Sequence, residues 1–218
     1  MPPRGLTGGR NSLEELLIQN ACIIDGTGSP GFMGSLTVSG ARITGIWKDP
    51  WYNIPARERL DSAGMVLCPG FVDTHTHSDM VLLHDGRQPA SITQGVTTEI
   101  LGQDGLSYAP LSPDNLRSYV LYLKGIDGMF CDVPLDFTST EQYLSRFEGK
   151  TGVNVAYLVP HCALRLETVG FENRLLTPSE MMLAQTMLRQ GIREGAKGLS
   201  TGLSYFPGAF SDTEELVE

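Results

Sequence analysis

The stretch that decides the fold is residues 65–79, which read MVLCPGFVDTHTHSD. Its first part is apolar and predicts a buried strand, and His75 and His77 follow where that strand ends. Alternate side chains of a strand point to the same face, so the two imidazoles would project side by side. Two neutral imidazoles on one face can chelate a divalent metal at about 2.0–2.1 Å each. A bare His-x-His pair also occurs as two ordinary loop histidines, but the buried strand and the flanking Asp73 and Asp79 favour a metal site.

Downstream of this pair, apolar strand-like runs alternate with helical stretches, which indicates βα units around a parallel sheet. The expected strands lie near Phe71, Thr98, Val155 and Leu199. The expected helices cover residues 115–123, 140–147 with Thr140 as a cap, and 178–195. The last of these has the strongest start, because Thr177 caps it, a proline follows, and Glu180 stands three residues after the cap.

Upstream of the pair the sequence predicts short strands separated by glycine and proline turns. Residues 35–38 and 42–47 alternate in hydropathy around a Ser-Gly-Ala turn, which predicts a hairpin, and residues 59–67 are expected to form a further strand pair. This pattern is typical of a small β-sandwich. We therefore expect a flexible tail over residues 1–14 and the N-terminal part of a β-sandwich over residues 15–68.

Three motifs in order carry a resemblance to a known family. The sequence PGFVDTHTH at residues 69–77 resembles the opening of the metal-dependent amidohydrolase superfamily. The segments QGVTT at residues 94–98 and GLSTGLSY at residues 198–205 narrow the resemblance to the D-aminoacylases, which are N-acyl-D-amino-acid deacylases. The resemblance implies an α/β fold, with a (β/α)8 TIM barrel preceded by part of a small β-sandwich. Residues 69–218 would be the first half of that barrel, about four βα units, so we expect the chain to be one part of a longer protein.

Asp104 is expected to complete the metal site with His75 and His77. It lies in Gly-Gln-Asp-Gly directly after a predicted strand, and barrel enzymes place their active groups at the carboxyl ends of strands. D-aminoacylase-like proteins usually carry Gly-Asn-Cys-Gly here with the cysteine as a ligand, and a carboxylate is a harder ligand than a thiolate. The resemblance implies one or two divalent metals, expected to be Zn2+, and this departure leaves their number and identity open. Asp-Gly also favours an ordinary turn, and Glu99 is a weaker candidate ligand.

Four other residues are of types that occur in such sites. His161 is expected to be structural and hydrogen-bonded near the site, whereas His84 is expected to be a solvated histidine. Tyr205 lies in a segment that resembles the mouth of the family's pocket, so it is a candidate for substrate binding or for a packed loop residue. Lys197 precedes its strand, which argues against a carboxylated metal-bridging lysine.

The resemblance implies hydrolysis of a linear amide bond, with N-acyl-D-amino acids as small-molecule substrates. The general-base aspartate is expected beyond the end of this chain, so no catalytic residue is assigned here and the chain alone is expected to be inactive. A cyclic-amide hydrolase of the dihydroorotase or hydantoinase type is the alternative enzyme. A non-catalytic metal-binding fragment is the alternative outside enzymes, and the oligomeric state is left open.

Composition narrows the partners of this chain. The 218 residues carry a formal net charge of −9, which disfavours binding to nucleic acid or anionic membranes through bulk charge. Apolar runs fall short of the ~20 residues needed to span a bilayer, and the first ten residues lack the apolar core of a signal peptide. The spacing of Cys22, Cys68, Cys131 and Cys162 fits no zinc knuckle, and all but Cys131 lie in or beside apolar runs. Buried free thiols in a cytoplasmic protein are therefore expected rather than disulfides.

Overall fold

The computed structural model describes residues 13–218, which fall into two compact units that divide between Pro69 and Gly70. Most of the tail predicted for residues 1–14 lies outside the described residues. Glu14 already belongs to the first strand. Each unit is described by itself.

The first unit is a single mixed sheet. Its strands are β1 (Glu14–Ile23), β2 (Phe32–Ser39), β3 (Arg42–Trp47), β4 (Ala56–Asp61) and β5 (Val66–Leu67). The order is β3-β2-β1-β4, and β5 also pairs with β1. The predicted hairpin is confirmed, because β2 and β3 pair antiparallel around Gly40, whose φ of +57° suits glycine. The described strands of this unit form one sheet, so the predicted sandwich is not confirmed.

The strand pair predicted over residues 59–67 is wrong. β4 and β5 do not pair with each other, because each runs parallel to β1 at a different part of its length. Leu17 and Ala21 on β1 and Leu36 on β2 are buried. The long central strand therefore organises the unit, and local turn signals do not reveal such parallel pairing.

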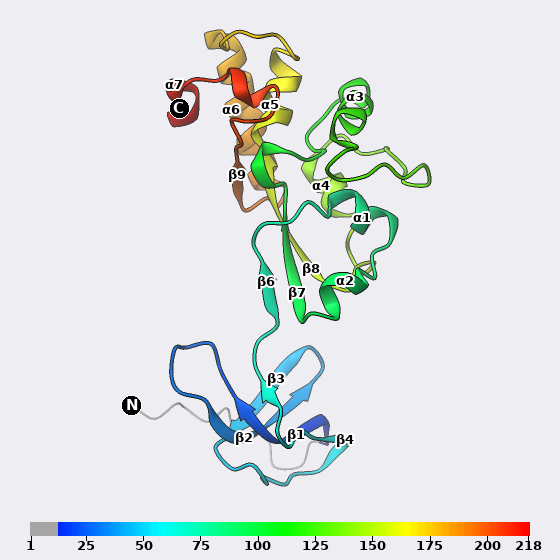
Figure 1. The fold of residues 1–218 in the computed structure, drawn as a ribbon, viewed down its shortest axis with the longest axis vertical. Helices are drawn as coiled ribbons and strands as arrows, with labels where there is room; N and C mark the ends of the chain where they lie inside the picture. Colours follow the sequence, from blue (N-terminus) through cyan, green and yellow to red (C-terminus); the bar gives the residue numbers. More distant parts are fainter. Residues whose placement is uncertain (1–12) are drawn as a thin grey trace. The chain divides into compact units, whose positions relative to one another are not determined.

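The second unit is an α/β structure with a parallel sheet, as predicted. Its strands are β6 (Phe71–Asp73), β7 (Val96–Leu101), β8 (Asn154–Pro160) and β9 (Gly198–Ser200). They pair in the order β6-β7-β8-β9, and every pair is parallel. Because neighbouring parallel strands share a direction, their carboxyl ends meet at one edge, where polar loops can converge (Figure 1).

Seven helices of this unit are described. They are α1 (Asp79–His84), α2 (Pro89–Ile92), α3 (Pro113–Leu123), α4 (Thr140–Leu144), α5 (His161–Thr168), α6 (Pro178–Arg193) and α7 (Thr213–Val217). Two single-turn 3-10 helices, η1 (Gln103–Gly105) and η2 (Gly208–Phe210), lie in loops. In the view of Figure 1, α1–α4 lie on the same side of β6 and β7. No helix in the described part of the chain is both long enough and apolar enough to cross a membrane.

The predicted start of α6 is confirmed. The hydroxyl of Thr177 accepts from the N–H of Glu180 at 3.3 Å, and the Glu180 carboxylate accepts from the N–H of Thr177 at 2.8 Å. This reciprocal pair satisfies two N–H groups that have no partner within the helix. The prediction for α4 was too long and misplaced its cap: the helix ends at Leu144, and the hydroxyl of Ser139, not Thr140, accepts from the N–H of Gln142.

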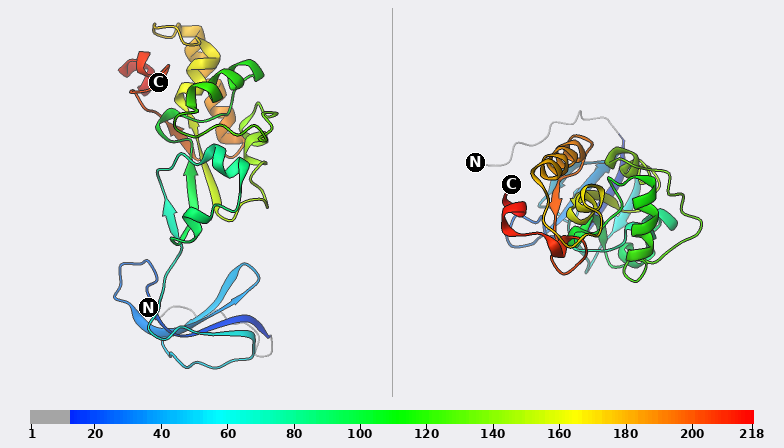
Figure 2. Two further views of the ribbon diagram at one scale, coloured as in Figure 1. Left: turned by 45° about the vertical axis from the view of Figure 1, so that its right-hand side comes forward. Right: turned by 90° about the horizontal axis from the view of Figure 1, so that it is seen from above.

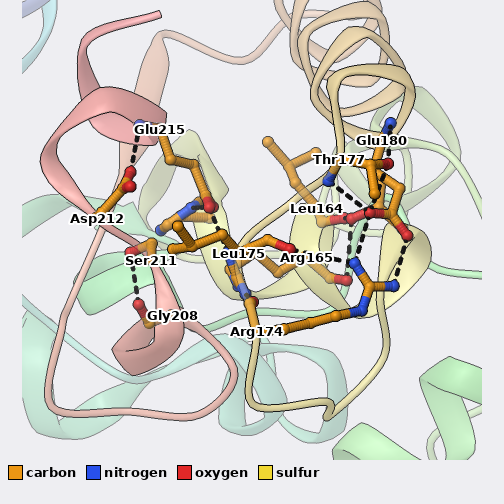
Figure 3. A network of polar contacts seen from close by, with 12 residues as sticks. Leu164, Arg165, Arg174, Leu175, Thr177, Glu180, Gly208, Ser211, Asp212 and Glu215 are labelled. Atoms are coloured by element: carbon orange, nitrogen blue, oxygen red, sulfur yellow. Dashed lines mark hydrogen bonds and ion pairs between the residues drawn. The ribbon is translucent and has the colours of Figure 1, made fainter.

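The core of the second unit lies between the sheet and its helices. Tyr157 and Val159 of β8 are fully buried there, together with Tyr119 and Leu123 of α3. A polar network joins α5 to α7 and to the loop before α6 (Figure 3). In it, the fully buried Arg165 donates to Glu215 and to the carbonyl oxygen of Arg174, the latter at 2.7 Å. Figure 2 shows α7, in red, beside α5 and α6.

The cysteines are free thiols, but they are not all buried as predicted. Cys162 is buried and Cys22 is half-buried, whereas Cys68 and Cys131 are exposed. Apolar neighbours in sequence misled the prediction for Cys68, because it lies at the connection between the two units and not inside a strand.

Candidate metal centre

Three predicted ligands converge at the carboxyl edge of the parallel sheet. His75 and His77 follow β6, and Asp104 lies in η1 after β7, the neighbouring strand. The Nε2 atoms of His75 and His77 lie 3.3 Å and 3.4 Å from the same oxygen, Oδ2 of Asp104. One ligand atom from each residue lies within 4.8 Å of the others. Two imidazole nitrogens and one carboxylate oxygen form a donor set that suits zinc and other divalent first-row metals.

The backbone around Asp104 adopts a conformation with positive φ at three residues. Asp104 has φ +56° and ψ +23°, a left-handed conformation that aspartate tolerates better than most residues. Gly102 and Gly105 on either side also have positive φ, +80° and +73°. A Cβ on Gly102 would lie 2.2 Å from the carbonyl oxygen of Leu158, so this loop passes directly over β8. The Gly-Gln-Asp-Gly sequence is therefore needed to place the carboxylate at the sheet edge.

The two histidines differ in their surroundings. The side chain of His75 is 61% exposed and that of His77 is 21% exposed. The His75 segment is shaped by Asp73, whose carboxylate accepts from the N–H of His75 at 3.1 Å. Asp73 thus acts on the backbone at the end of β6, in partial agreement with the expectation that it supports the site.

Asp127 is a site residue that sequence reasoning missed. It lies in the loop after α3, is 3% exposed, and places Oδ1 3.9 Å from Nδ1 of His77. Its other oxygen accepts from the hydroxyl of Tyr108 at 2.7 Å. Burial raises the pKa of Asp127 to about 6, although the Tyr108 hydrogen bond acts in the opposite direction. In the sequence, Asp127 precedes a glycine and resembles an ordinary turn residue, so no local signal marks it.

Asp79 does not flank the site as predicted, because it points into the core. Its Oδ1 accepts from the hydroxyls of Ser107 and Tyr143, the latter at 2.9 Å. Complete burial, with a smaller contribution from the nearby charge of Asp127, raises the pKa of Asp79 to about 7. Glu99 is also buried, and its carboxylate accepts from Ser78 and is not one of the three converging ligands.

The other histidines lie outside the converging group. His161 is buried as a structural residue, with Nδ1 2.9 Å from the hydroxyl of Thr201 and Nε2 2.8 Å from Glu215. His84 is exposed to solvent as expected, and in addition its ring stacks on Phe130 and its Nδ1 lies 2.9 Å from Asp132. Both partners lie more than 40 residues along the chain, so the sequence near His84 gave no sign of them.

Tyr205 and Lys197 lie outside the group of converging ligands. Tyr205 is half-buried, packs against the core, and donates from its N–H to the carbonyl oxygen of Gly202 at 3.2 Å. Its role toward a substrate stays a prediction. Lys197 lies just before β9, where its N–H donates to Tyr157 at 2.7 Å, and it is not one of the converging ligands.

Comparison with known proteins identifies relatives over nearly the whole chain. No protein-family model matches. The chain is 33% identical over 205 residues to the N-acyl-D-aspartate deacylase of Alcaligenes xylosoxydans xylosoxydans. The matched region covers 94% of this chain and 40% of that protein. It is 34% identical to the D-aminoacylase of the same organism, with 94% and 41% covered.

Solved structures agree with the sequence relatives. N-acyl-D-glutamate deacylase from Bordetella bronchiseptica, complexed with zinc and a phosphonate inhibitor, has a TM-score of 0.81 at 33% identity and covers 94% of this chain and 42% of that one. A D-aminoacylase structure with a binuclear metal centre has a TM-score of 0.79 at 32% identity, with 94% and 42% covered.

The curled parallel sheet and the ligand cluster at its carboxyl edge define the second unit as an amidohydrolase-type α/β structure. Within that class, the chain is homologous to part of the N-acyl-D-amino-acid deacylases, so the resemblance carried by its motifs is confirmed. The chain spans 40–41% of the length of these curated relatives.

Proposed function

We propose that this chain is the first half of a metal-dependent amidohydrolase that hydrolyses N-acyl-D-amino acids to a carboxylate and a D-amino acid. The single observation that carries the proposal is the convergence of His75, His77 and Asp104 on one point at the sheet edge. The homology to N-acyl-D-aspartate deacylase and D-aminoacylase supports the reaction and the substrate class. We further propose an eight-stranded barrel for the whole protein and a cytoplasmic location.

The residues present fit a divalent metal. His75 and His77 offer Nε2, Asp104 offers Oδ2, and a buried carboxylate faces the far nitrogen of His77. Bound there, a divalent metal would supply a water of lowered pKa and polarise the acyl carbonyl group. Zinc is the metal we propose, and one of the structural relatives is a zinc complex.

The chain's own residues hold and shape the site. The left-handed loop fixes the Asp104 carboxylate, and both imidazoles, which lie in the segment after β6, place Nε2 close to it. Tyr205 is proposed to line the substrate pocket near the end of β9. The general base is proposed to lie outside residues 1–218, as the family resemblance implies. A carboxylate is a harder ligand than the cysteine usual in this family, so zinc would be held less firmly here.

The metal content of the purified chain tests the site. We expect one or more equivalents of divalent metal by plasma mass spectrometry in the wild type, and loss of that metal in H75A/H77A. H84A is the matched control, because His84 pairs with Asp132 and is not one of the converging ligands. Equal metal content in all three proteins would contradict the proposed site.

The reaction is tested by release of free amino acid from N-acetyl-D-aspartate and N-acetyl-D-glutamate, compared with their L-enantiomers and with hydantoin. We expect no turnover by the metal-loaded chain alone, because the general base is proposed to lie elsewhere. Metal-dependent turnover by the pure chain would show that residues 1–218 already contain the base. Hydrolysis of the cyclic amide in preference to the linear D-substrates would contradict the proposed substrate class.

A further inference from the structure

Two buried polar atoms face each other behind the metal site without a hydrogen bond. Nδ1 of His77 and Oδ1 of Asp127 are both shielded from solvent, and neither has a hydrogen-bond partner among the described residues. They lie 3.9 Å apart. A charge-assisted N–H···O hydrogen bond is about 2.7–2.9 Å long. A movement of about 1 Å would therefore satisfy both atoms at once, and a buried polar atom that stays unpaired is unfavourable.

The carboxylate of Asp127 is held in this orientation from behind. Its Oδ2 accepts from the hydroxyl of Tyr108 at 2.7 Å, and the Tyr108 side chain is fully buried in the core. Oδ1 of Asp127 is therefore the oxygen that can accept a further hydrogen bond, and it faces the imidazole of His77. The aspartate is thus built into the protein interior and is not a surface charge that happens to lie near a histidine.

We infer that Asp127 is a positioning residue that accepts a hydrogen bond from Nδ1–H of His77 and so presents the unprotonated Nε2 to the metal. This inference rests on the proposed metal site. A neutral imidazole has one protonated nitrogen, and a carboxylate acceptor at Nδ1 places the proton there. Nε2, which lies 3.4 Å from the Asp104 carboxylate, then keeps its lone pair for coordination.

The two histidine ligands are consequently unequal. His77 is the less exposed of the two and has a carboxylate behind it, whereas the ring of His75 is mostly exposed. The His75 ring contacts the Asp104 carboxylate through its Nε2. His77 is therefore the ligand whose orientation is set by the protein, and His75 is the ligand that adjusts to the metal.

The first test needs no metal. Long-range proton–nitrogen NMR spectra of the histidine rings distinguish the two neutral tautomers in the metal-free chain. Because the Asp104 carboxylate also lies 3.4 Å from Nε2 of His77, the spectra are compared in a D104A background, where we expect the Nδ1–H tautomer of His77 and a shift toward Nε2–H when D127A is added. D132N, which alters the exposed carboxylate paired with His84, is the matched control and should leave His77 unchanged. An unchanged His77 tautomer when D127A is added would overturn the inference.

The second test is the Zn2+ dissociation constant from competition with a chelating dye. We expect D127N, D127A and Y108F to weaken binding, D127N and D127A by about 10–100-fold, because partners of metal-bound histidines have effects of this size. If D127A does not fold, the nearly isosteric D127N carries the test. Wild-type affinity in a folded D127N and Y108F would mean that Asp127 is merely structural. Failure of the wild type to bind metal would instead overturn the proposed function, while the tautomer result would still decide the role of Asp127.

Discussion

The side-chain hydroxyl of Ser200 accepts a hydrogen bond from the N–H of Gly105 at 3.0 Å and donates one to the carbonyl oxygen of Gly102. Ser200 is the last residue of β9, and the two glycines flank Asp104. One buried hydroxyl therefore joins both sides of the metal-ligand loop to the end of a strand almost one hundred residues away. β9 supports the metal centre without supplying a ligand.

We expect Ser200→Ala to loosen the Asp104 loop. The change leaves a buried N–H and a buried carbonyl oxygen without their partner, which costs about 1–3 kcal/mol of unfolding free energy. Zn2+ binding should weaken as well, because Asp104 loses its fixed position. Denaturant unfolding and a metal titration measure the two effects. Ser204→Ala changes an exposed serine of the following loop and should affect neither; equal behaviour of the two variants would contradict this role of Ser200.

Gly202→Ala should displace the same loop by direct contact. A Cβ at Gly202 would lie 2.3 Å from the carbonyl oxygen of Asp104, and rigid backbone cannot yield as a flexible side chain can. We expect destabilisation at the upper end of the usual range for point mutations, about 3 kcal/mol, together with loss of metal affinity. Gly125→Ala is the matched control, because it has open space around it and no positive φ. If Gly202→Ala and Gly125→Ala have the same stability and the same metal affinity, the Asp104 loop can move more easily than the structure indicates.

Asp104→Cys restores the ligand that D-aminoacylase-like proteins usually carry here. A thiolate is softer than a carboxylate, so the variant should favour Zn2+ and Cd2+ over Mn2+ more strongly than the wild type does. Competition between equimolar metals, followed by mass spectrometry of the bound fraction, measures this preference. Asp104→Asn keeps the shape and removes the charge, and should weaken binding of all these metals. A wild-type metal preference in Asp104→Cys would mean that residue 104 does not coordinate.

Local spacing explains what the sequence could predict. Three features are each defined by residues that are close together in the sequence, and each is present in the structure: the His-x-His pair, the capping box at Thr177 and the hairpin around Gly40. Asp104 also followed from local signals, because a carboxylate between glycines after a buried strand falls at the carboxyl edge of a parallel sheet. These features need no knowledge of distant contacts.

The rest depends on contacts between distant segments. Asp127 reaches His77 across about fifty positions, and Tyr108 holds it from a third segment. Nothing near Asp127 distinguishes it from any aspartate that precedes a glycine. The parallel pairing of β4 and β5 with β1 is hidden for the same reason, since parallel pairing is not marked by the turn that marks a hairpin.

The attachment of α7 should be sensitive to acid. Burial raises the pKa of Glu215, but hydrogen bonds from His161 and Arg165 of α5 lower it more, so the pKa lies below its ordinary value. A carboxylate with a lowered pKa in the folded state stabilises the fold above its unfolded pKa of about 4.3, and this stabilisation is lost as the pH falls through the folded pKa. We therefore expect the unfolding free energy of the wild type to fall more steeply than that of Glu215→Gln as the pH is lowered through the unfolded and then the folded pKa of Glu215.

At pH 7, Glu215→Gln should be less stable than the wild type by about 1–3 kcal/mol, because the fully buried Arg165 keeps its charge and loses the carboxylate that neutralises it. Urea unfolding at several pH values measures both effects on the same samples. Glu214→Gln changes an exposed neighbour on the same helix and should follow the wild type at every pH. If Glu215→Gln loses stability in acid as steeply as the wild type, the acid response arises from other carboxylates, and the contacts shown in Figure 3 do not control the attachment of α7.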